Sequence, residues 1–148
     1  MHHREVERAL RSRGKGRARW RLLAKRVAGE VETPYDLRER ALQFAVMVVE
    51  FVESLPPGVV SWEIGRQLVK SGTSVGANFE EGDVAESARD RVHKLSIARK
   101  EARESRHWCR VIGKAAVGEP DAAAYLAEEA LQLVRILSKM IQGAKRSQ

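Results

Sequence analysis

One apolar stripe between residues 88 and 116 limits most strongly what this chain can fold into. Its members recur in steps of three and four, a spacing that places them on one side of a long helix. Small side chains occupy the middle of the stripe, so neighbouring helices must approach closely if no voids are to remain. We therefore expect helices to pack on more than one side of this segment. The stripe consists of Ala88, Val92, Leu95, Ala98, Ala102, Ser105, Cys109, Ile112 and Ala116.

The composition favours a helical protein with one domain. The chain has 148 residues, of which 43% are hydrophobic and 5% aromatic, and this length allows one hydrophobic core. The one cysteine, Cys109, lies on the apolar stripe, which indicates a small buried hydrophobe in a reducing compartment. No apolar run is long enough for a transmembrane helix or a secretory signal. We therefore expect a cytoplasmic protein with no membrane partner.

Residues 34–148 are predicted to form an all-α, up-and-down antiparallel four-helix bundle. Turns are expected at 56–58, 82–86 and 117–120, and the last helix is expected to end at Gly143. The predicted N-caps are Asp36, Ser61, Ser87 and Asp121. Besides the stripe, the predicted core positions are Leu37, Ala41, Phe44, Ala45, Val48, Val52, Leu55, Ile64, Leu68, Val75, Leu126, Ala130, Leu133, Leu137, Met140 and Ile141.

The first 33 residues form a basic N-terminal arm. They hold ten Lys or Arg and four Glu, so most of the net charge of +7 lies there. Residues 17–31 place Trp20, Leu23, Ala24 and Val27 on one side of a helix. A basic amphipathic segment can bind nucleic acid, an anionic membrane or a groove on a partner subunit, and it can also be a solubilising tail. Its cations are Arg17, Arg19, Arg21, Lys25 and Arg26.

A second stripe on the helix around residues 88–116 consists of cations. We call the residues Arg99, Arg103, Arg106, Arg110 and Lys114 the cationic row. At 1.5 Å per residue the row is about 22 Å long, and its members are each other's i, i+3 and i, i+4 neighbours. Like charges at these spacings destabilise a helix. Compensation is expected either from Glu80, Glu81, Glu128 and Glu129, from acids across a subunit interface, or from the phosphates of a nucleic acid. The row can also be a solvated charged flank that is only partly paired to Glu.

Two blocks carry a resemblance to a known family. They are Ser-Val-Gly-Ala-Asn-x-Glu-Glu at 74–81 and Lys-Glu-Ala-x-Glu-Ser-x-x-Trp at 100–108. Over about residues 35 to 142 the chain resembles the 23S rRNA intervening-sequence proteins. The resemblance implies a left-handed four-helix bundle that assembles into pentameric, barrel-like rings. It also points to a relative, the accessory protein of diversity-generating retroelements, a basic nucleic-acid-binding ring that works beside a reverse transcriptase. Typical members lack the long arm, which is either an addition or a start assigned too far upstream.

Residues that could carry chemistry are better explained by packing. Glu104 with His107, and Asp90 with His93, have the i, i+3 spacing of di-iron bundles. Both pairs lie on one helix, however, so they cannot share a metal. The serines lie in no nucleophile turn, and the glycines form no phosphate loop. Structural or interface roles are expected for Asn78, Glu80, Glu81 and Trp108.

These observations lead to a functional prediction. We expect a non-enzymatic homo-oligomer, without cofactor or metal, that binds RNA or DNA through phosphates. The cationic row would supply fixed contacts, and the cations of the arm would supply mobile ones. The alternative is a structural or scaffold homo-oligomer with protein partners only, in which the row pairs with acids across subunit contacts.

Overall fold

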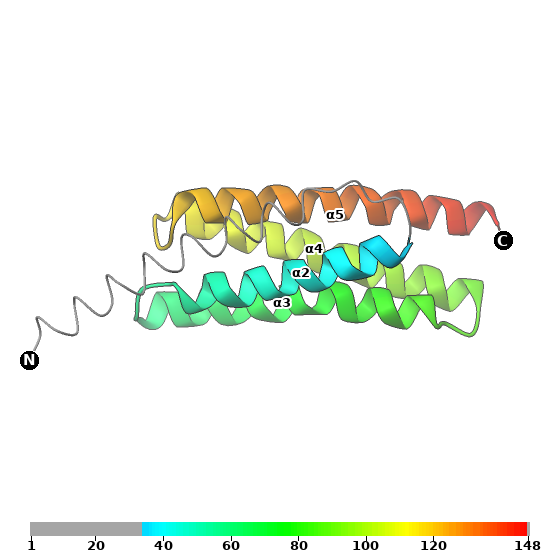
Figure 1. The fold of residues 1–148 in the computed structure, drawn as a ribbon, viewed down its shortest axis with the longest axis horizontal. Coiled ribbons are helices and arrows are strands. Elements are labelled where there is room, and N and C mark those ends of the chain that lie inside the picture. Colours follow the sequence, from blue (N-terminus) through cyan, green and yellow to red (C-terminus); the bar gives the residue numbers. More distant parts are fainter. Residues whose placement is uncertain (1–33, 148) are drawn as a thin grey trace, which may run out of the picture.

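The fold prediction is confirmed by a computed structural model, which describes residues 34–147 (Figure 1). The helices are α2 (Pro34–Glu53), α3 (Val59–Asp83), α4 (Ala88–Lys114) and α5 (Pro120–Arg146). Each runs antiparallel to the one before it, and this part of the chain contains no strand. The predicted basic arm, residues 1–33, lies outside the described residues.

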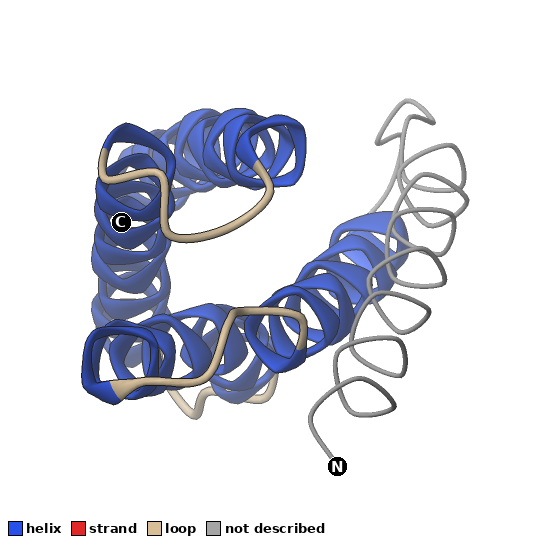
Figure 2. Cartoon of the chain, turned by 90° about the vertical axis from the view of Figure 1, so that its left-hand side faces the viewer, coloured by secondary structure: helices blue, strands red, loops and turns tan. Residues whose placement is uncertain are grey.

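Helix α4 lies between two neighbours, as its stripe of small residues predicts. Its most extensive packing is against α5 and α3, and Figure 2 shows the helices in a view along the long axis of the bundle. Ala98, Ala102 and Ser105 are completely buried along this stripe. Because such short side chains fill little space, the backbones of the neighbouring helices approach α4 closely.

The glycines of α3 allow α2 to approach it in the same way. A Cβ atom on Gly72 would lie 2.9 Å from Cγ1 of Val48, and one on Gly65 would lie 2.8 Å from Cγ1 of Val52. Glycine costs helix stability in a helix interior, by roughly 1 kcal/mol relative to alanine. Tertiary packing offsets this cost here, because a larger residue would collide with stiff valine side chains.

The hydrophobic core extends through all four helices. Phe44, Met47 and Phe51 from α2, Phe79 from α3 and Leu133 from α5 are almost fully buried members of this core. Most of the predicted core positions are buried as expected. A few are only partly buried at the margin of the core, namely Ala45, Val52, Leu55, Ile64, Val92 and Met140, and Ala88 and Ala116 are exposed.

Of the four predicted N-caps, one is confirmed. Ser87 precedes α4, and its Oγ accepts a hydrogen bond from the backbone N of Asp90 at 3.1 Å. The other helices begin earlier than predicted, so Asp36, Ser61 and Asp121 lie inside the first turn of their helices. At α5 the reason is Pro120, whose fixed φ and missing N–H suit the first helical position.

The predicted end of the last helix is also wrong. Helix α5 continues through Gly143 to Arg146. No atom outside the helix backbone lies within 4 Å of the position of a Cβ on Gly143. The glycine therefore serves no close approach here, and its helix-breaking tendency is too weak to end a well-packed helix.

Candidate functional site

The cationic row lies on the flank of α4 that borders α5 and solvent. Arg103, Arg110 and Lys114 are exposed, whereas Arg99 and Arg106 are half-buried. Nη1 of Arg99 donates to Oγ of Ser138 on α5 at 3.4 Å. Nearer the other end of α4, the Cβ position of Gly113 lies 3.5 Å from the Cβ of Ala123. These two contacts set the antiparallel register, which brings the row beside residues 123–138 of α5.

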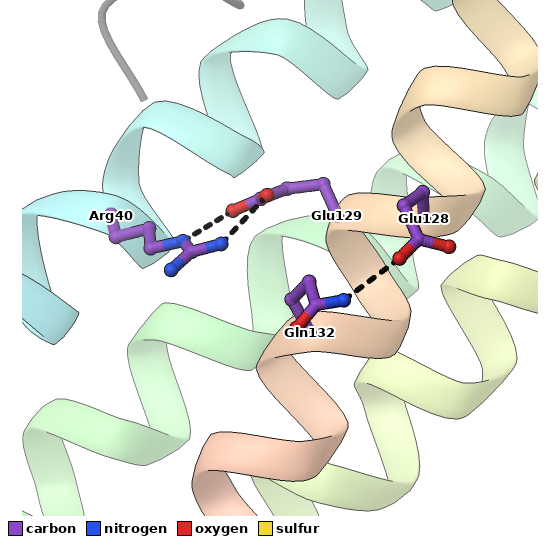
Figure 3. A network of polar contacts seen from close by, with 4 residues as sticks. All are labelled: Arg40, Glu128, Glu129 and Gln132. Atoms are coloured by element: carbon purple, nitrogen blue, oxygen red, sulfur yellow. Dashed lines mark hydrogen bonds and ion pairs between the residues drawn. The ribbon is translucent and has the colours of Figure 1, made fainter. Parts of the chain in front are cut away.

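Two carboxylates, those of Glu128 and Glu129, occur in that stretch of α5, and Glu129 is bound to another helix. Its oxygens accept from Nε and Nη2 of Arg40 at 2.6 and 3.0 Å, and Figure 3 shows the side chain reaching toward α2. This bidentate bond raises the pKa of Arg40, and only 16% of the Arg40 side chain is exposed. Glu129, one of the candidate compensators, is therefore not a partner of the cationic row.

The other three expected compensators do not reach the row either. Glu128 accepts from the side-chain amide of Gln132 at 2.7 Å (Figure 3). Glu81 pairs with Nζ of Lys94 at 2.5 Å, and Glu80 is exposed on α3. Within residues 34–147, no carboxylate oxygen lies within 4.0 Å of a side-chain nitrogen of the row, so no ion pair forms there.

Cations at the other end of α4 have carboxylate partners. Lys94 binds Glu81, and Nη1 of Arg91 lies 3.7 Å from Oδ1 of Asp83. Arg38 of α2 forms a hydrogen-bonded ion pair with the same Asp83. The bond to Glu81 raises the pKa of Lys94. The carboxylates at the end of α3 therefore neutralise Arg91 and Lys94 near the start of α4.

Asn78 and Trp108 occupy the structural positions expected of them. The amide nitrogen of Asn78 donates to the carbonyl oxygen of Ser74 at 2.9 Å, so the bond stays within α3. Trp108 packs against the core, and its Nε1 donates to Oε1 of Glu104 at 3.3 Å. Whether these residues also form a subunit contact stays a prediction.

Residues considered for chemistry are part of the packed interior. Ser105 donates to Ser71 across α3 and α4 at 2.9 Å, and both are buried. Burial raises the pKa of Cys109 to about 12, so its thiol is protonated at neutral pH. Among residues 34–147, no three His, Cys, Asp or Glu side chains form a group that could hold a metal ion.

An exposed apolar patch at the α2–α3 turn was missed by the sequence analysis. Val59, Val60 and Trp62 are 80%, 58% and 64% exposed. They adjoin a groove of about 610 Å³ that is lined by Val52, Leu55, Pro56, Pro57, Gly58, Ser61, Trp62, Gly65, Arg66, Val69 and Lys70. The available signal was Val59-Val60 followed by Trp62 directly after Pro57-Gly58, a concentration of apolar residues at a helix start that the core pattern does not use.

A comparison of the chain with models of protein families identifies its family. The model of the 23S rRNA-intervening sequence proteins matches residues 34–139. The chain belongs to this family. A search of curated proteins gave no match. The family membership agrees with the resemblance seen in the two sequence blocks.

A solved structure shares the fold. It is the 1.70 Å crystal structure of a protein of unknown function from the S23 ribosomal protein family of Bacteroides thetaiotaomicron. The two chains are 26% identical with a TM-score of 0.65, and the match covers 74% of this chain and 97% of that one. None of the helices within residues 34–147 has the length and hydrophobicity that a membrane-spanning helix requires.

Proposed function

We propose that this protein binds RNA or DNA by its phosphates and has no enzymatic activity. The observation that carries the proposal is the cationic row, whose five members lack a carboxylate partner within residues 34–147. Guanidinium groups bind phosphate oxygens in a bidentate manner, and a row along a helix follows a backbone without reading its bases. The expected binding is therefore salt-dependent and nearly independent of sequence.

In the wider role that we propose, the bundle self-associates in the cytoplasm as a ring of several copies, five by the family resemblance. A ring repeats the row in each subunit, so that one strand contacts several rows and gains affinity by avidity. Arg17, Arg19, Arg21, Lys25 and Arg26 of the arm, outside the described residues, would add further phosphate contacts. A reverse transcriptase or another nucleic-acid enzyme is the proposed partner.

Fluorescence anisotropy of a labelled single-stranded RNA and a labelled DNA duplex tests the proposal. Titrations of the full chain at two salt concentrations should show binding that weakens steeply as salt rises. For a single strand held by the five cations of one row, the slope of log affinity against log salt is expected near about −3.5. A chain starting at Thr33 measures the share of the arm. Absence of binding by either chain at low salt would refute the proposal.

The second candidate function is a scaffold homo-oligomer with protein partners only. The exposed apolar patch at the α2–α3 turn favours it, because such patches mark protein contacts. Light scattering after gel filtration should then show that the double variant Val60→Ser with Trp62→Ser dissociates the oligomer. Under this function the protein does not bind nucleic acid. If the variant keeps the mass of the full assembly, the patch is not the contact between copies.

A further inference from the structure

A groove lies beside the turn that joins α2 to α3, two helices that run side by side (Figure 1). We call it the α2–α3 groove. Its volume is about 610 Å³, and apart from glycines its lining is apolar except for Ser61, Arg66 and Lys70. Its walls are open to solvent, since Trp62 is 64% exposed and Pro57 is also exposed. An open groove suits a segment of another protein better than a small molecule, which binding sites usually enclose.

The walls of the α2–α3 groove are held in place before any partner binds. The φ angles of Pro56 and Pro57 are fixed by their rings. Gly58 has a φ of 148°, which residues with a side chain rarely adopt. A Cβ on Gly65 would lie 2.8 Å from Cγ1 of Val52, so α2 and α3 are closely packed where they line the groove. Such a preformed site loses little conformational entropy on binding.

The charged side chains that line the groove are both cations. Arg66 and Lys70 are exposed, and the lining contains no carboxylate. Cζ of Arg66 lies 5.7 Å from the centre of the Trp62 ring, a distance at which cation–π attraction holds the guanidinium beside the groove. Arg66 also lies 3.6 Å from a carboxylate oxygen of Glu63, but both side chains are more than half exposed, so this ion pair contributes little.

Lys70 has no carboxylate within ion-pair distance in the described part of the chain, residues 34–147. Glu101 of α4 interacts with it electrostatically without forming such a pair. Two cations beside an apolar surface complement a partner that is apolar along one side and acidic along the adjoining flank.

The spacing of the cations matches one turn of a helix. Arg66 and Lys70 are four residues apart on α3, which is about 6 Å along its axis. From Trp62 to Lys70 the helix extends about 12 Å, the length of roughly two turns of a partner helix. Carboxylates at i and i+4 of that partner have the same separation as the two cations, and apolar side chains at i and i+4 form the adjacent stripe.

A helical partner fits this surface better than an extended one. Extended peptides commonly bind by hydrogen bonding to the edge of a sheet, and residues 34–147 contain no strand. The mostly apolar lining offers few hydrogen-bonding groups to the backbone of an extended peptide. A helix satisfies its own backbone groups and needs only side-chain contacts.

We propose that the α2–α3 groove binds an acidic amphipathic helix of another protein. Two apolar side chains of that helix, one turn apart, enter the groove beside Trp62, and two carboxylates, one turn apart, pair with Arg66 and Lys70. The proposal does not depend on nucleic-acid binding by the cationic row. It differs from the second candidate function because the occupant is not another copy of this chain.

A designed peptide tests the proposal. The probe is a fluorescein-labelled, alanine-based helix with two leucines four residues apart and two glutamates four residues apart on the adjoining flank. Fluorescence anisotropy with the full chain should show saturable binding. Two matched peptides, one with lysines in place of the glutamates and one with a central proline that breaks the helix, should each bind at least about tenfold more weakly. Absence of saturable binding, or equal binding of the three peptides, would overturn the proposal.

Charge exchange on the protein tests whether the two cations direct the contact. Arg66→Glu with Lys70→Glu should weaken binding of the glutamate peptide by at least about tenfold and should gain binding of the lysine peptide. The matched control, Arg135→Glu with Lys139→Glu, reverses two exposed cations of the same spacing on α5 and should change the affinity by less than about twofold. Equal losses in the two variants would mean general attraction to a basic protein and would overturn the proposal.

Two further measurements separate this occupant from others. Light scattering after gel filtration should give the same mass for the wild-type chain and for Arg66→Glu with Lys70→Glu, with or without the peptide. A lower mass would mean that a second copy occupies the groove. Labelled RNA should bind this variant no more weakly than it binds the α5 control, and a greater loss would assign the groove to nucleic acid instead. Circular dichroism verifies that both variants remain folded.

Discussion

The two halves of α4 differ in whether their cationic side chains have carboxylate partners. In the first half, Arg91 and Lys94 each lie near a carboxylate of α3. In the second half, the cationic row runs beside a stretch of α5 that contains Glu128 and Glu129, yet those carboxylates bind Gln132 and Arg40. Proximity in register is therefore not enough for an ion pair, because the side chain must also lie on the correct face of its helix. This contrast is why we propose an external partner for the row.

The largest effect is expected when the charges in the second half of α4 are reversed and the RNA affinity is compared with that after reversal in the first half. Arg103→Glu, Arg106→Glu and Arg110→Glu together should weaken RNA affinity at low salt by at least about 100-fold, because three phosphate contacts become repulsive. The comparison is Arg91→Glu with Lys94→Glu, which should change affinity by less than about threefold. Anisotropy titration measures both. An equal loss in the two variants would erase the distinction and indicate general attraction to a basic protein.

Glu129→Ala tests whether Glu129 binds Arg40 rather than the cationic row. We expect the free energy of unfolding to fall by about 2 to 3 kcal/mol, because the mostly buried Arg40 side chain loses its bidentate partner. Urea unfolding followed by circular dichroism measures this. The control, Glu128→Ala, removes an exposed carboxylate and should cost less than about 0.5 kcal/mol. A several-fold rise in RNA affinity for Glu129→Ala would show that Glu129 neutralises the row in solution.

Two glycine substitutions compare a closely packed position with an open one. Gly72→Ala should destabilise the bundle by about 1 kcal/mol, since the clash with Val48 exceeds the gain in helix propensity. Gly143→Ala should stabilise it by about 0.5 to 1 kcal/mol, because nothing lies near its Cβ position. Thermal and urea unfolding measure both changes. Equal signs for the two variants would mean that α2 and α3 are not closely packed at Gly72.

The smallest expected effect concerns the buried side of α4. The pKa of Cys109 is about 12 in the folded chain and near 9 when the thiol is exposed. The unfolded state therefore loses its proton first, and the contribution of Cys109 to stability is full below pH 9 and is lost as the pH rises toward 12. At pH 9 the loss relative to pH 8 should be about 0.4 kcal/mol. Cys109→Ala should lack this component, and an identical pH profile would contradict burial of the thiol.

Much of the fold follows from the sequence because helix faces are a local property. The spacing of Leu95, Ala98 and Ala102 places them together whatever their neighbours are. Helix starts were less predictable, because Pro120 and Gly58 offered starts that compete with Asp121 and Ser61. The end at Gly143 was wrong because a weak local tendency was overridden by packing of the whole helix.

The candidate site was only partly predictable, since ion pairing depends on tertiary register. Periodicity places the cationic row on one flank, but it does not say which flank of α5 carries Glu129. One signal was available: Glu129 lies three residues after Leu126 and four before Leu133, on the core-facing stripe of its helix. A carboxylate in that position needs a partner from another helix, and Arg40 lies 89 residues away. The apolar patch at the α2–α3 turn carried no such periodic signal.

The like charges of the row also give the bundle two opposite responses to salt. In the free protein, added salt screens repulsion along α4 and should raise the melting temperature. In a complex with a polyanion, the same salt releases the ligand and removes the stabilisation that binding provides. Melting curves of free and bound protein should therefore converge as salt increases. Calorimetry therefore measures, without any label, how much of the protein has the polyanion bound. A protein whose row is paired internally would show neither the rise in melting temperature of the free form nor the loss of stabilisation of the bound form.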